Sequence, residues 1–331
     1  MCYNYVGGKM KVTILGTGAY GLALSKILVE NKNEVVMWTT FESEKQELLE
    51  TKKSSKLNGF KLDNGVVITT DLEESIRNSK LIVIAIPTAF VTNVCKELKK
   101  YIKSNQHICI ASKGIEQGTC LFIHDMIKKQ IKTKYIGAIS GPSFAVDLIK
   151  SVPVGLAVAS KSKKTLNIIR EALSNDHFKL IPTNDIIGIE VCGAVKNIIA
   201  IASGMIDGMG YPISTQALLI THSLHDIKAI IHALGGSKKT ILSFAGFGDI
   251  LLTCTSEKSR NYTFGKLIGS NTSKEEIEEY RKNITVEGLY TLKSIHKLIN
   301  YKKIEIPTIN IIYDIVFKNE KIDKLIEYLM I

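Results

Sequence analysis

The 331-residue chain is poor in residues that mark several common classes of protein. Only four of its basic residues are arginines, although lysines bring the net charge to +11. Proteins that read nucleic acids usually cluster their positive charge and favour arginine, so this dispersed lysine content argues against a nucleic-acid partner. The charge still suits an anionic small molecule. The arginines are Arg77, Arg170, Arg260 and Arg281.

Cysteines are few and scattered, and no pair has the spacing of a CxxC motif. The sequence therefore gives no sign of a zinc ribbon or of a disulfide framework. Thiols dispersed in this way are typical of a reducing compartment, so we expect a cytoplasmic protein. The six cysteines are Cys2, Cys95, Cys109, Cys120, Cys192 and Cys254.

Long apolar runs are also lacking. No run approaches the ~20 residues that span a bilayer, so we expect no membrane insertion. The first residues, "MCYNYVGGK", do not have the layout of a signal peptide. They carry no pattern, and Met10 is an alternative start to Met1.

The length of the chain predicts two domains, since 331 residues are too many for a typical single core. The first half alternates short β-rich runs with helical segments, and the remainder reads as helices. We therefore expect an α/β, Rossmann-like, doubly wound sheet over residues 10–187, followed by an all-α domain over residues 188–331. The expected strands are Lys11–Leu15, Glu34–Trp38, Val66–Thr70, Leu81–Pro87, His107–Ser112, Tyr135–Ser140, Val154–Ser160 and Phe178–Thr183.

The expected helices of the second half include Lys239–Thr253, and the overlapping stretch "AGFGDILLTCTSEKSRNYTFG" (Ala245–Gly265) is expected to contribute a loop. The other expected helices are Asp185–Met205, Ser214–Leu234, Lys274–Lys282, Glu287–Asn300 and a tail from Pro307.

A glycine motif follows the first expected strand directly. The segment "KVTILGTGAYGLAL" contains Gly16, Gly18 and Gly21 in GxGxxG spacing, between a strand and a helix. In that context the glycines allow a tight turn and close approach of the backbone to a pyrophosphate. The free N–H groups at the start of the helix also favour an anion. The motif predicts a dinucleotide cofactor, NAD or NADP.

The end of the second strand, "VVMWTTFESE", does not distinguish NAD from NADP as the cofactor. Selective NAD binders usually carry an acid at this position, and NADP binders often have an arginine nearby. Here Trp38 is followed by Thr39 and Thr40, so neither signal is present, and Glu42 is assigned to the following loop.

One lysine stands in an apolar helix. The segment "EVCGAVKNIIAIASGM" has the pattern of a buried helix, yet it contains Lys196. The residues three and four positions away cannot pair with a charge. Because lysine is almost never fully buried without a partner or a function, Lys196 marks a candidate site.

Polar residues gather in three further segments. "ASKGIEQG" places Lys113 after a strand, and "SGPSFA" places Gly141 and Ser143 after another; ligands of open α/β sheets bind at such carboxyl ends. "AGFGDILLTC" contains Asp249 beside two glycines. It is followed by Ser259-Arg260-Asn261, a donor cluster that suits a phosphate.

These segments together resemble the bacterial NAD(P)-dependent glycerol-3-phosphate dehydrogenases over nearly the whole chain. The most specific matches are "GAVKN" and "GDILLTC…SRN", and the others occur in the same order. The resemblance implies reversible hydride transfer between the nicotinamide and C2 of dihydroxyacetone phosphate, which gives sn-glycerol 3-phosphate for phospholipid synthesis. We expect a small phosphate substrate, a homodimer and no metal.

The resemblance also implies residue roles. Lys196 would give and take the proton at the C2 oxygen, with Asp249, Lys113 and Asn197 beside it. The implied substrate-binding residues are Lys113, Gly141, Ser143, Lys196, Asp249, Ser259, Arg260 and Asn261. The implied cofactor-binding residues are Gly16, Gly18, Ala19, Tyr20, Gly21, Thr39, Lys113, Ala145, Arg260, Thr285 and Glu287. Thr253 also matches a position near the site.

The chain departs from the family pattern at His222, where an arginine is usual, and at Thr39-Thr40, which lacks the basic residue that many members have. Three histidines, His222, His225 and His232, share one expected helix. The first two are spaced for a metal pair, but no third ligand is evident, and we interpret them as ordinary histidines.

Two other classes of protein fit part of the pattern. A 6-phosphogluconate or 3-hydroxyacid dehydrogenase also places a lysine on a helix of its second domain, but it lacks "GDILLTC…SRN". A non-catalytic nucleotide sensor or nucleic-acid-binding protein would keep the glycine loop without needing Lys196, Asp249 and Arg260 together. Turnover of dihydroxyacetone phosphate, and salt-sensitive DNA binding, distinguish these alternatives.

Overall fold

A computed structural model describes residues 10–331, and its contacts divide the chain into two compact units. The sheet unit comprises residues 10–112 and Ile123–Ile186; the helical unit comprises Lys113–Phe122 and Ile187–Ile331. A continuous division at 187/188 is expected from the sequence, but the segment Lys113–Phe122 belongs with the helices. Ile115 and Phe122 form an isolated antiparallel bridge there, and both are buried in the apolar core of the helical unit.

The sheet unit is built on eight strands in the order β3-β2-β1-β4-β5-β6-β7-β8. All neighbours are parallel except β6 and β7. Every expected strand is present, with ends that shift by a few residues. The strands are β1 (Lys11–Leu15), β2 (Glu34–Trp38), β3 (Val67–Thr69), β4 (Leu81–Ile84), β5 (His107–Ile110), β6 (Ile136–Ser140), β7 (Val154–Ser160) and β8 (Phe178–Thr183).

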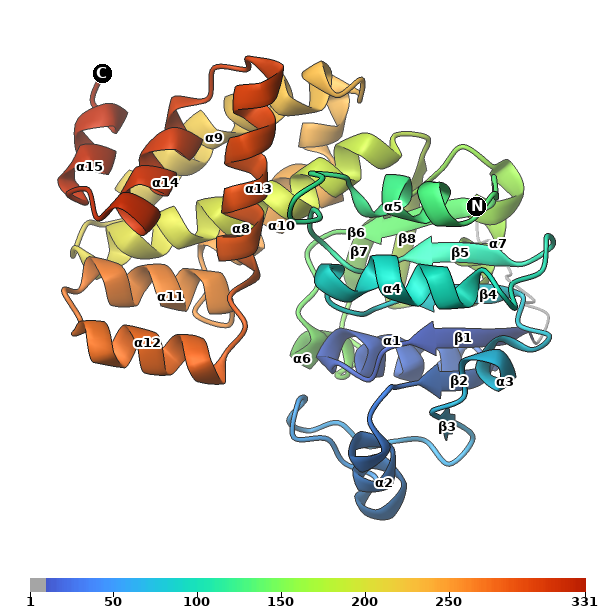
Figure 1. The fold of residues 1–331 in the computed structure, drawn as a ribbon. Helices are drawn as coiled ribbons and strands as arrows, with labels where there is room; N and C mark the ends of the chain where they lie inside the picture. The colour runs from blue at the N-terminus through green and yellow to red at the C-terminus, as the bar shows by residue number, and fades with distance from the viewer. Residues whose placement is uncertain (1–9) are drawn as a thin grey trace. The chain divides into compact units, whose positions relative to one another are not determined.

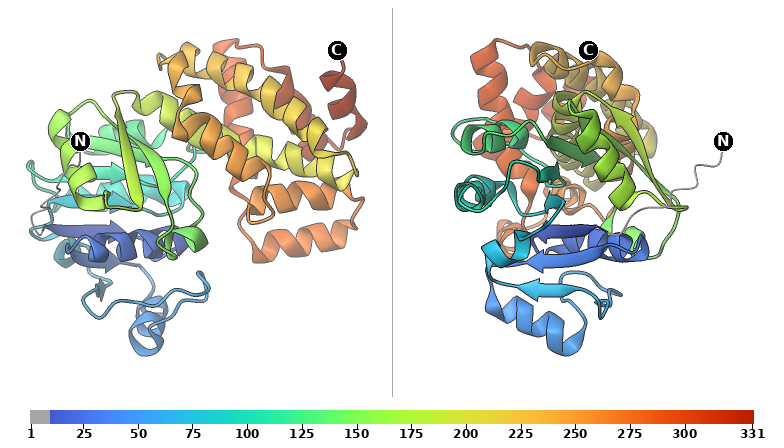
Figure 2. Two further views of the ribbon diagram at one scale, coloured as in Figure 1. Left: turned by 180° about the vertical axis from the view of Figure 1, so that it is seen from behind. Right: turned by 90° about the vertical axis from the view of Figure 1, so that its right-hand side faces the viewer.

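Helices cover both faces of this sheet, as a doubly wound fold requires. One face carries α1 (Ala19–Glu30) and α7 (Lys163–Leu173), which contact each other. The other carries α4 (Thr88–Leu98) and α5 (Ile123–Gln130), which pack side by side (Figures 1 and 2). The strands between them are buried on both faces; all four residues of β4 are buried. Shorter helices are α2 (Glu42–Thr51), α3 (Leu72–Ile76) and α6 (Ala145–Leu148).

The antiparallel pair has a local cause. A parallel crossover usually contains a full α-helix. The connection from β6 to β7 contains only the four-residue helix α6. The chain therefore returns beside β6 in the opposite direction, with Gly137 opposite Ser160.

The centre of the helical unit is α8 (Ile186–Gly208), a 23-residue helix with a mean hydropathy of 1.7 in its most apolar window. By length and composition it could cross a membrane, so the expectation that no segment has bilayer length is wrong. However, 94% of that window is buried inside the protein. Among residues 10–331 no other helix passes this test. Helix α8 is therefore a core helix, and the rest of the unit packs around it.

The segment expected as the single helix Lys239–Thr253 is divided into three pieces. A short 3-10 helix, η1 (Lys238–Leu242), is followed by a π-helical turn, η2 (Phe244–Gly248), and then by α10 (Asp249–Cys254). Gly246 has non-helical angles, φ −88° and ψ −108°. A Cβ at Gly246 would overlap the carbonyl oxygen of Ile241, so this kink requires glycine. The remaining helices are α9 (Ile213–Ala233), α11 (Arg260–Gly269), α12 (Lys274–Asn283), α13 (Glu287–Lys302), α14 (Pro307–Lys318) and α15 (Asp323–Leu329).

Helices α8 and α11 approach each other closely because glycines face each other across the contact. A Cβ at Gly204 of α8 would overlap the carbonyl oxygen of Tyr262, and one at Gly265 of α11 would overlap that of Ile201. Small residues at such crossings let two backbones approach closely. This contact holds the first residues of α11 against the helix that carries Lys196.

Candidate active site

Three charged side chains meet in the helical unit. The Lys196 ammonium lies 2.5 Å from Oδ1 of Asp249, and the Lys113 ammonium lies 2.7 Å from Oδ2 of the same carboxylate. The Asp249 side chain is only 1% exposed and that of Lys196 only 9%. The partner that a lysine in an apolar helix requires is therefore Asp249, 53 residues away in the chain.

The second partner of Lys196 is a threonine. The Nζ of Lys196 donates to Oγ1 of Thr253 at 2.9 Å, and the Thr253 hydroxyl donates to the backbone oxygen of Asp249 at 2.6 Å. Burial lowers the pKa of Lys196, the positive charge of Lys113 adds to this effect, and Asp249 opposes it, so that the pKa is about 8. Lys196 can therefore exchange a proton near neutral pH.

The kink before α10 positions Asp249. As the first residue of that helix it lies at the positive end of the helix dipole, which favours a carboxylate. Burial alone would raise its pKa, but the charges of Lys113 and Lys196 and their hydrogen bonds outweigh burial and lower the pKa. Asp249 is therefore an anion between two cations.

Lys113 reaches the carboxylate from the loop that follows β5. Gly114 has φ +142°, a conformation that glycine adopts readily and side-chain residues rarely do. The Lys113 side chain is 16% exposed, more than that of Lys196. Lys113 is the more accessible of the two ammonium groups.

The Ser-Arg-Asn cluster lies at the start of α11, not in the loop expected over Ala245–Gly265. The hydroxyl of Ser259 accepts from the backbone N–H of Tyr262 at 3.3 Å, which makes Ser259 the N-cap. Asn261 is buried, and its Oδ1 accepts from the N–H of Gly288 at 2.8 Å. Arg260 extends outward with a half-exposed side chain, 3.7 Å from the carboxylate of Glu287.

The other predicted residues of the helical unit lie in two settings. Asn197 is buried beside Lys196 in α8, and Thr285 is exposed just before α13. A Cβ at Gly288 would come 2.8 Å from the backbone oxygen of Asn197 and from Oδ1 of Asn261. This close contact ties α8, α11 and α13 together around the polar cluster.

In the sheet unit, the glycine loop has the shape that a dinucleotide needs. A Cβ at Gly16 would lie 2.5 Å from the oxygen of Ala85, and one at Gly21 would lie 2.5 Å from the oxygen of Gly16. Nothing lies within 4 Å of a Cβ position at Gly18. The following helix, which begins at Ala19, has no side-chain cap and no acid in its first turn. The loop therefore fits a pyrophosphate beside the helix N-terminus.

Four predicted residues of the sheet unit lie close together. The hydroxyl groups of Tyr20 and Ser143 are 3.0 Å apart, and Ser143 donates to the oxygen of Gly141 at 3.1 Å. Ala145 begins α6, which contacts α1. The loop after β6 is thereby fixed against the helix that follows the glycine motif.

The structure also adds residues that the sequence reasoning missed. Glu44, in the first turn of α2, accepts a hydrogen bond from Thr17 inside the glycine motif. It also accepts one from Thr39 at 3.0 Å. The sequence contains a signal, since Thr39 and Glu44 both follow β2 closely. Glu42, expected in the loop, is instead the first residue of α2.

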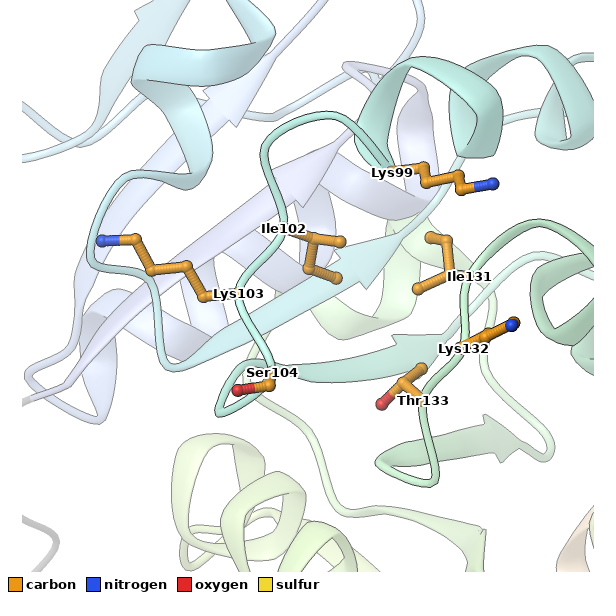
Figure 3. A pocket seen from close by; sticks show the side chains of 7 residues that line it. All are labelled: Lys99, Ile102, Lys103, Ser104, Ile131, Lys132 and Thr133. Atoms are coloured by element: carbon orange, nitrogen blue, oxygen red, sulfur yellow. The ribbon is translucent and has the colours of Figure 1, made fainter.

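A separate pocket of about 220 Å³ lies elsewhere in the sheet unit, where two loops precede β5 and β6 (Figure 3). The ammonium groups of Lys99 and Lys103 point away from each other, and Lys132 also extends outward (Figure 3). These loops lie at the amino ends of the parallel strands, opposite the edge that carries the glycine motif. The pocket is therefore not part of the candidate site.

Among the described residues, the cysteines and histidines form no metal cluster. Cys120 is half-buried and the other described cysteines, Cys95, Cys109, Cys192 and Cys254, are buried; none of these five forms a disulfide. Cys2, like Met1, lies outside the described residues. In the part of the chain from residue 10 onward, no group of three or more His, Cys, Asp or Glu residues is arranged to hold a metal.

A dinucleotide-type sheet with its glycine loop, together with a buried lysine in a helical unit, defines a nicotinamide-dependent dehydrogenase. Two family models match the chain. The N-terminal model of NAD-dependent glycerol-3-phosphate dehydrogenase matches residues 11–166, and the C-terminal model matches residues 185–327. The chain belongs to this family, and it is an oxidoreductase that uses NAD(P).

Known glycerol-3-phosphate dehydrogenases are similar to the chain over nearly its full length. Glycerol-3-phosphate dehydrogenases of Staphylococcus epidermidis and Staphylococcus aureus are 35% and 34% identical, over 97% of this chain and of each relative. The crystal structure of glycerol-3-phosphate dehydrogenase from Coxiella burnetii has a TM-score of 0.92 at 28% identity, covering 97% of this chain and 99% of that one. A ketopantoate reductase from Ralstonia eutropha shares only the fold, with a TM-score of 0.61 at 12% identity over 97% and 100% of the two chains.

Proposed function

We propose that the chain interconverts dihydroxyacetone phosphate and sn-glycerol 3-phosphate, with Lys196 as the proton donor and acceptor at the C2 oxygen. The observation that carries this proposal is the buried Lys196–Asp249–Lys113 cluster. In the reducing direction, ketone, NAD(P)H and one proton give the alcohol and NAD(P)+. The nicotinamide supplies the hydride, and the residues supply the proton, charge and orientation.

Lys196 has the properties that this role requires. Reduction of a ketone develops negative charge on the oxygen, which an ammonium group stabilises and then protonates. Its pKa of about 8 keeps it largely protonated at neutral pH but allows it to release the proton. In the oxidising direction, the neutral amine takes the hydroxyl proton.

Asp249 and Lys113 adjust the proton affinity of Lys196. The carboxylate holds the ammonium in place through Oδ1 and stabilises its charged form. Lys113 binds the other oxygen and partly neutralises the carboxylate. We infer that Asp249 orients the lysine, and that Lys113 joins it in holding the substrate.

We further propose that the start of α11 receives the substrate phosphate. Arg260 supplies a fork of N–H donors that matches phosphate geometry. The helix N-terminus and the amide of Asn261 add to this. Ser259 fixes where the helix begins. In the sheet unit, Gly16, Gly18, Ala19, Tyr20, Gly21, Thr39 and Ala145 would contact the cofactor, with Thr285 and Glu287 completing the set.

The test is an initial-rate assay of the purified chain with dihydroxyacetone phosphate and NADH or NADPH. We expect reduction of this substrate, and no oxidation of 3-hydroxybutyrate or 6-phosphogluconate, the substrates of the rival dehydrogenase classes, in a parallel assay with NAD+ or NADP+. Turnover of either rival substrate, without dihydroxyacetone phosphate activity, would overturn the proposal. A cytoplasmic location and a homodimer remain predictions.

A further inference from the structure

We propose that Glu44 is the residue that selects the cofactor, and that it makes the chain prefer NAD(H) over NADP(H). This rests on the proposed function only in that both concern the same dinucleotide site. It goes beyond the family assignment, since the relatives named for NAD(P)+ leave the choice between the two cofactors open.

The carboxylate of Glu44 is held at the position where a dinucleotide fold discriminates its cofactors. Two hydroxyl groups donate to its Oε2: that of Thr17, which lies between the first two glycines of the motif, and that of Thr39, which follows β2. In such folds an acid at the end of the second strand accepts the ribose 2′-hydroxyl of NAD. Here β2 ends at Trp38 and is followed by Thr39, and the acid comes from the first turn of the next helix.

Both threonines are buried, so their hydroxyl groups depend on protein acceptors. Thr17 and Thr39 are each 4% exposed. Losing the carboxylate would leave buried donors without this acceptor, which is costly. The acid is therefore part of a built arrangement, and Oε1 is further held by the ammonium of Lys56.

The arrangement keeps Glu44 charged and leaves it room for one more donor. Burial opposes ionisation, but the hydrogen bonds from Lys56, Thr17 and Thr39 outweigh it and lower the pKa of the carboxylate. An ionised carboxylate has about four acceptor positions, and the contacts above use three. The fourth suits a hydroxyl group, whereas a 2′-phosphate would bring a like charge.

The surroundings of Glu44 disfavour a phosphate further. Helix α2 carries four glutamates and one lysine, Lys45, which is already paired with Glu42 at 2.9 Å. Glu42 and Glu44 both lie in the first turn of α2, where the helix dipole would otherwise attract an anion. The only cation seen on Glu44 among the described contacts, Lys56, is engaged by the carboxylate itself. Like-charge contact of this kind rejects the wrong partner more than it strengthens the right one.

The experiment measures cofactor binding directly, so that it does not depend on turnover. The full chain is titrated with NADH and with NADPH, following the fluorescence of the reduced nicotinamide. We expect NADH to bind at least about tenfold more tightly, which corresponds to one repelled charge. Equal binding, or tighter NADPH binding, by the unmodified chain overturns the proposal, even if the variants below fail to fold.

The variant Glu44→Gln keeps the shape and removes the charge. We expect the NADH:NADPH binding ratio to shift toward NADPH by about tenfold, mainly through tighter NADPH binding. A ratio that stays within twofold of the unmodified chain would overturn the proposal. The matched control is Glu50→Gln, which removes the same charge from an exposed position on the same helix and should leave the ratio unchanged.

Failure of the proposed function gives a different result. A chain that binds NADH in preference, and loses that preference in Glu44→Gln, but does not reduce dihydroxyacetone phosphate, refutes the assigned reaction and supports the role of Glu44. A chain that reduces the ketone equally well with either cofactor refutes the role of Glu44 and supports the reaction.

Discussion

Lys196 and Asp249 form a buried ion pair 2.5 Å long, and a second lysine binds the opposite oxygen of the same carboxylate. Two cations thus share one anion, and all three side chains are largely buried. Burying these three charged groups costs free energy, because desolvation disfavours the charged form of each. Perturbed charges of this kind are typical of functional sites.

The first prediction concerns pH. Lys196 has a pKa of about 8, lowered by burial. Reduction needs the ammonium form, so its kcat should fall as the pH rises through about 8. Oxidation needs the neutral amine, so its kcat should rise through the same range. Rate profiles in both directions check this; profiles that change in the same direction would refute the assignment of the proton to Lys196.

The second prediction concerns Asp249→Asn. The carboxylate favours the charged form of Lys196, so its loss leaves two ammonium groups facing each other and lowers the pKa of Lys196 further. At neutral pH we expect kcat for reduction to fall roughly 10²-fold, with the descending limb of the pH profile moved to lower pH. The control is Glu257→Gln, an exposed acid. A drop in kcat without any movement of the profile would contradict the account.

The third prediction concerns Arg260→Ala. If Arg260 binds the phosphate, its loss should raise KM for dihydroxyacetone phosphate by roughly tenfold or more, with a smaller effect on kcat. Arg281→Ala is the matched control, because Arg281 is a surface residue paired with Glu278 on α12. An unchanged KM in Arg260→Ala would remove this residue from the phosphate site.

The fourth prediction concerns the contact between α8 and α11. In Gly265→Ala the added methyl would overlap the carbonyl oxygen of Ile201, so the helices must separate. We expect the free energy of unfolding to fall by about 1–3 kcal/mol, measured by urea denaturation. Gly65→Ala is the control: its Cβ would meet only the carboxylate of Asp63, at 3.2 Å. Equal stability of both variants would show that the crossing tolerates a side chain.

The strands could be read from the sequence because their signal is local. A run such as "LIVI" is apolar throughout, and β4 is buried throughout. Helix α11 was missed for the opposite reason. Its glycines lower helix propensity, and they are present because α8 passes close by. Only the packed structure shows why glycine stands in a helix there.

The site was predictable in its residues more than in its contacts. Lys196 was conspicuous because a lone lysine in an apolar helix needs a partner, and motif resemblance pointed to Asp249. That they meet depends on the kink at Gly246, which the pattern Lys239–Thr253 gave no reason to expect. The position of the Glu44 carboxylate depends on a contact with Thr17, 27 positions away, which no local pattern reveals.

The most direct test of the central claim is the rate of dihydroxyacetone phosphate reduction by Lys196→Ala, with NADH binding measured on the same sample. We expect kcat to fall roughly 10²- to 10⁴-fold while the Kd for NADH changes little, because the glycine loop is untouched. Lys228→Ala, at an exposed lysine of α9, should retain full activity. A Lys196→Ala variant that keeps near-normal kcat would contradict the account.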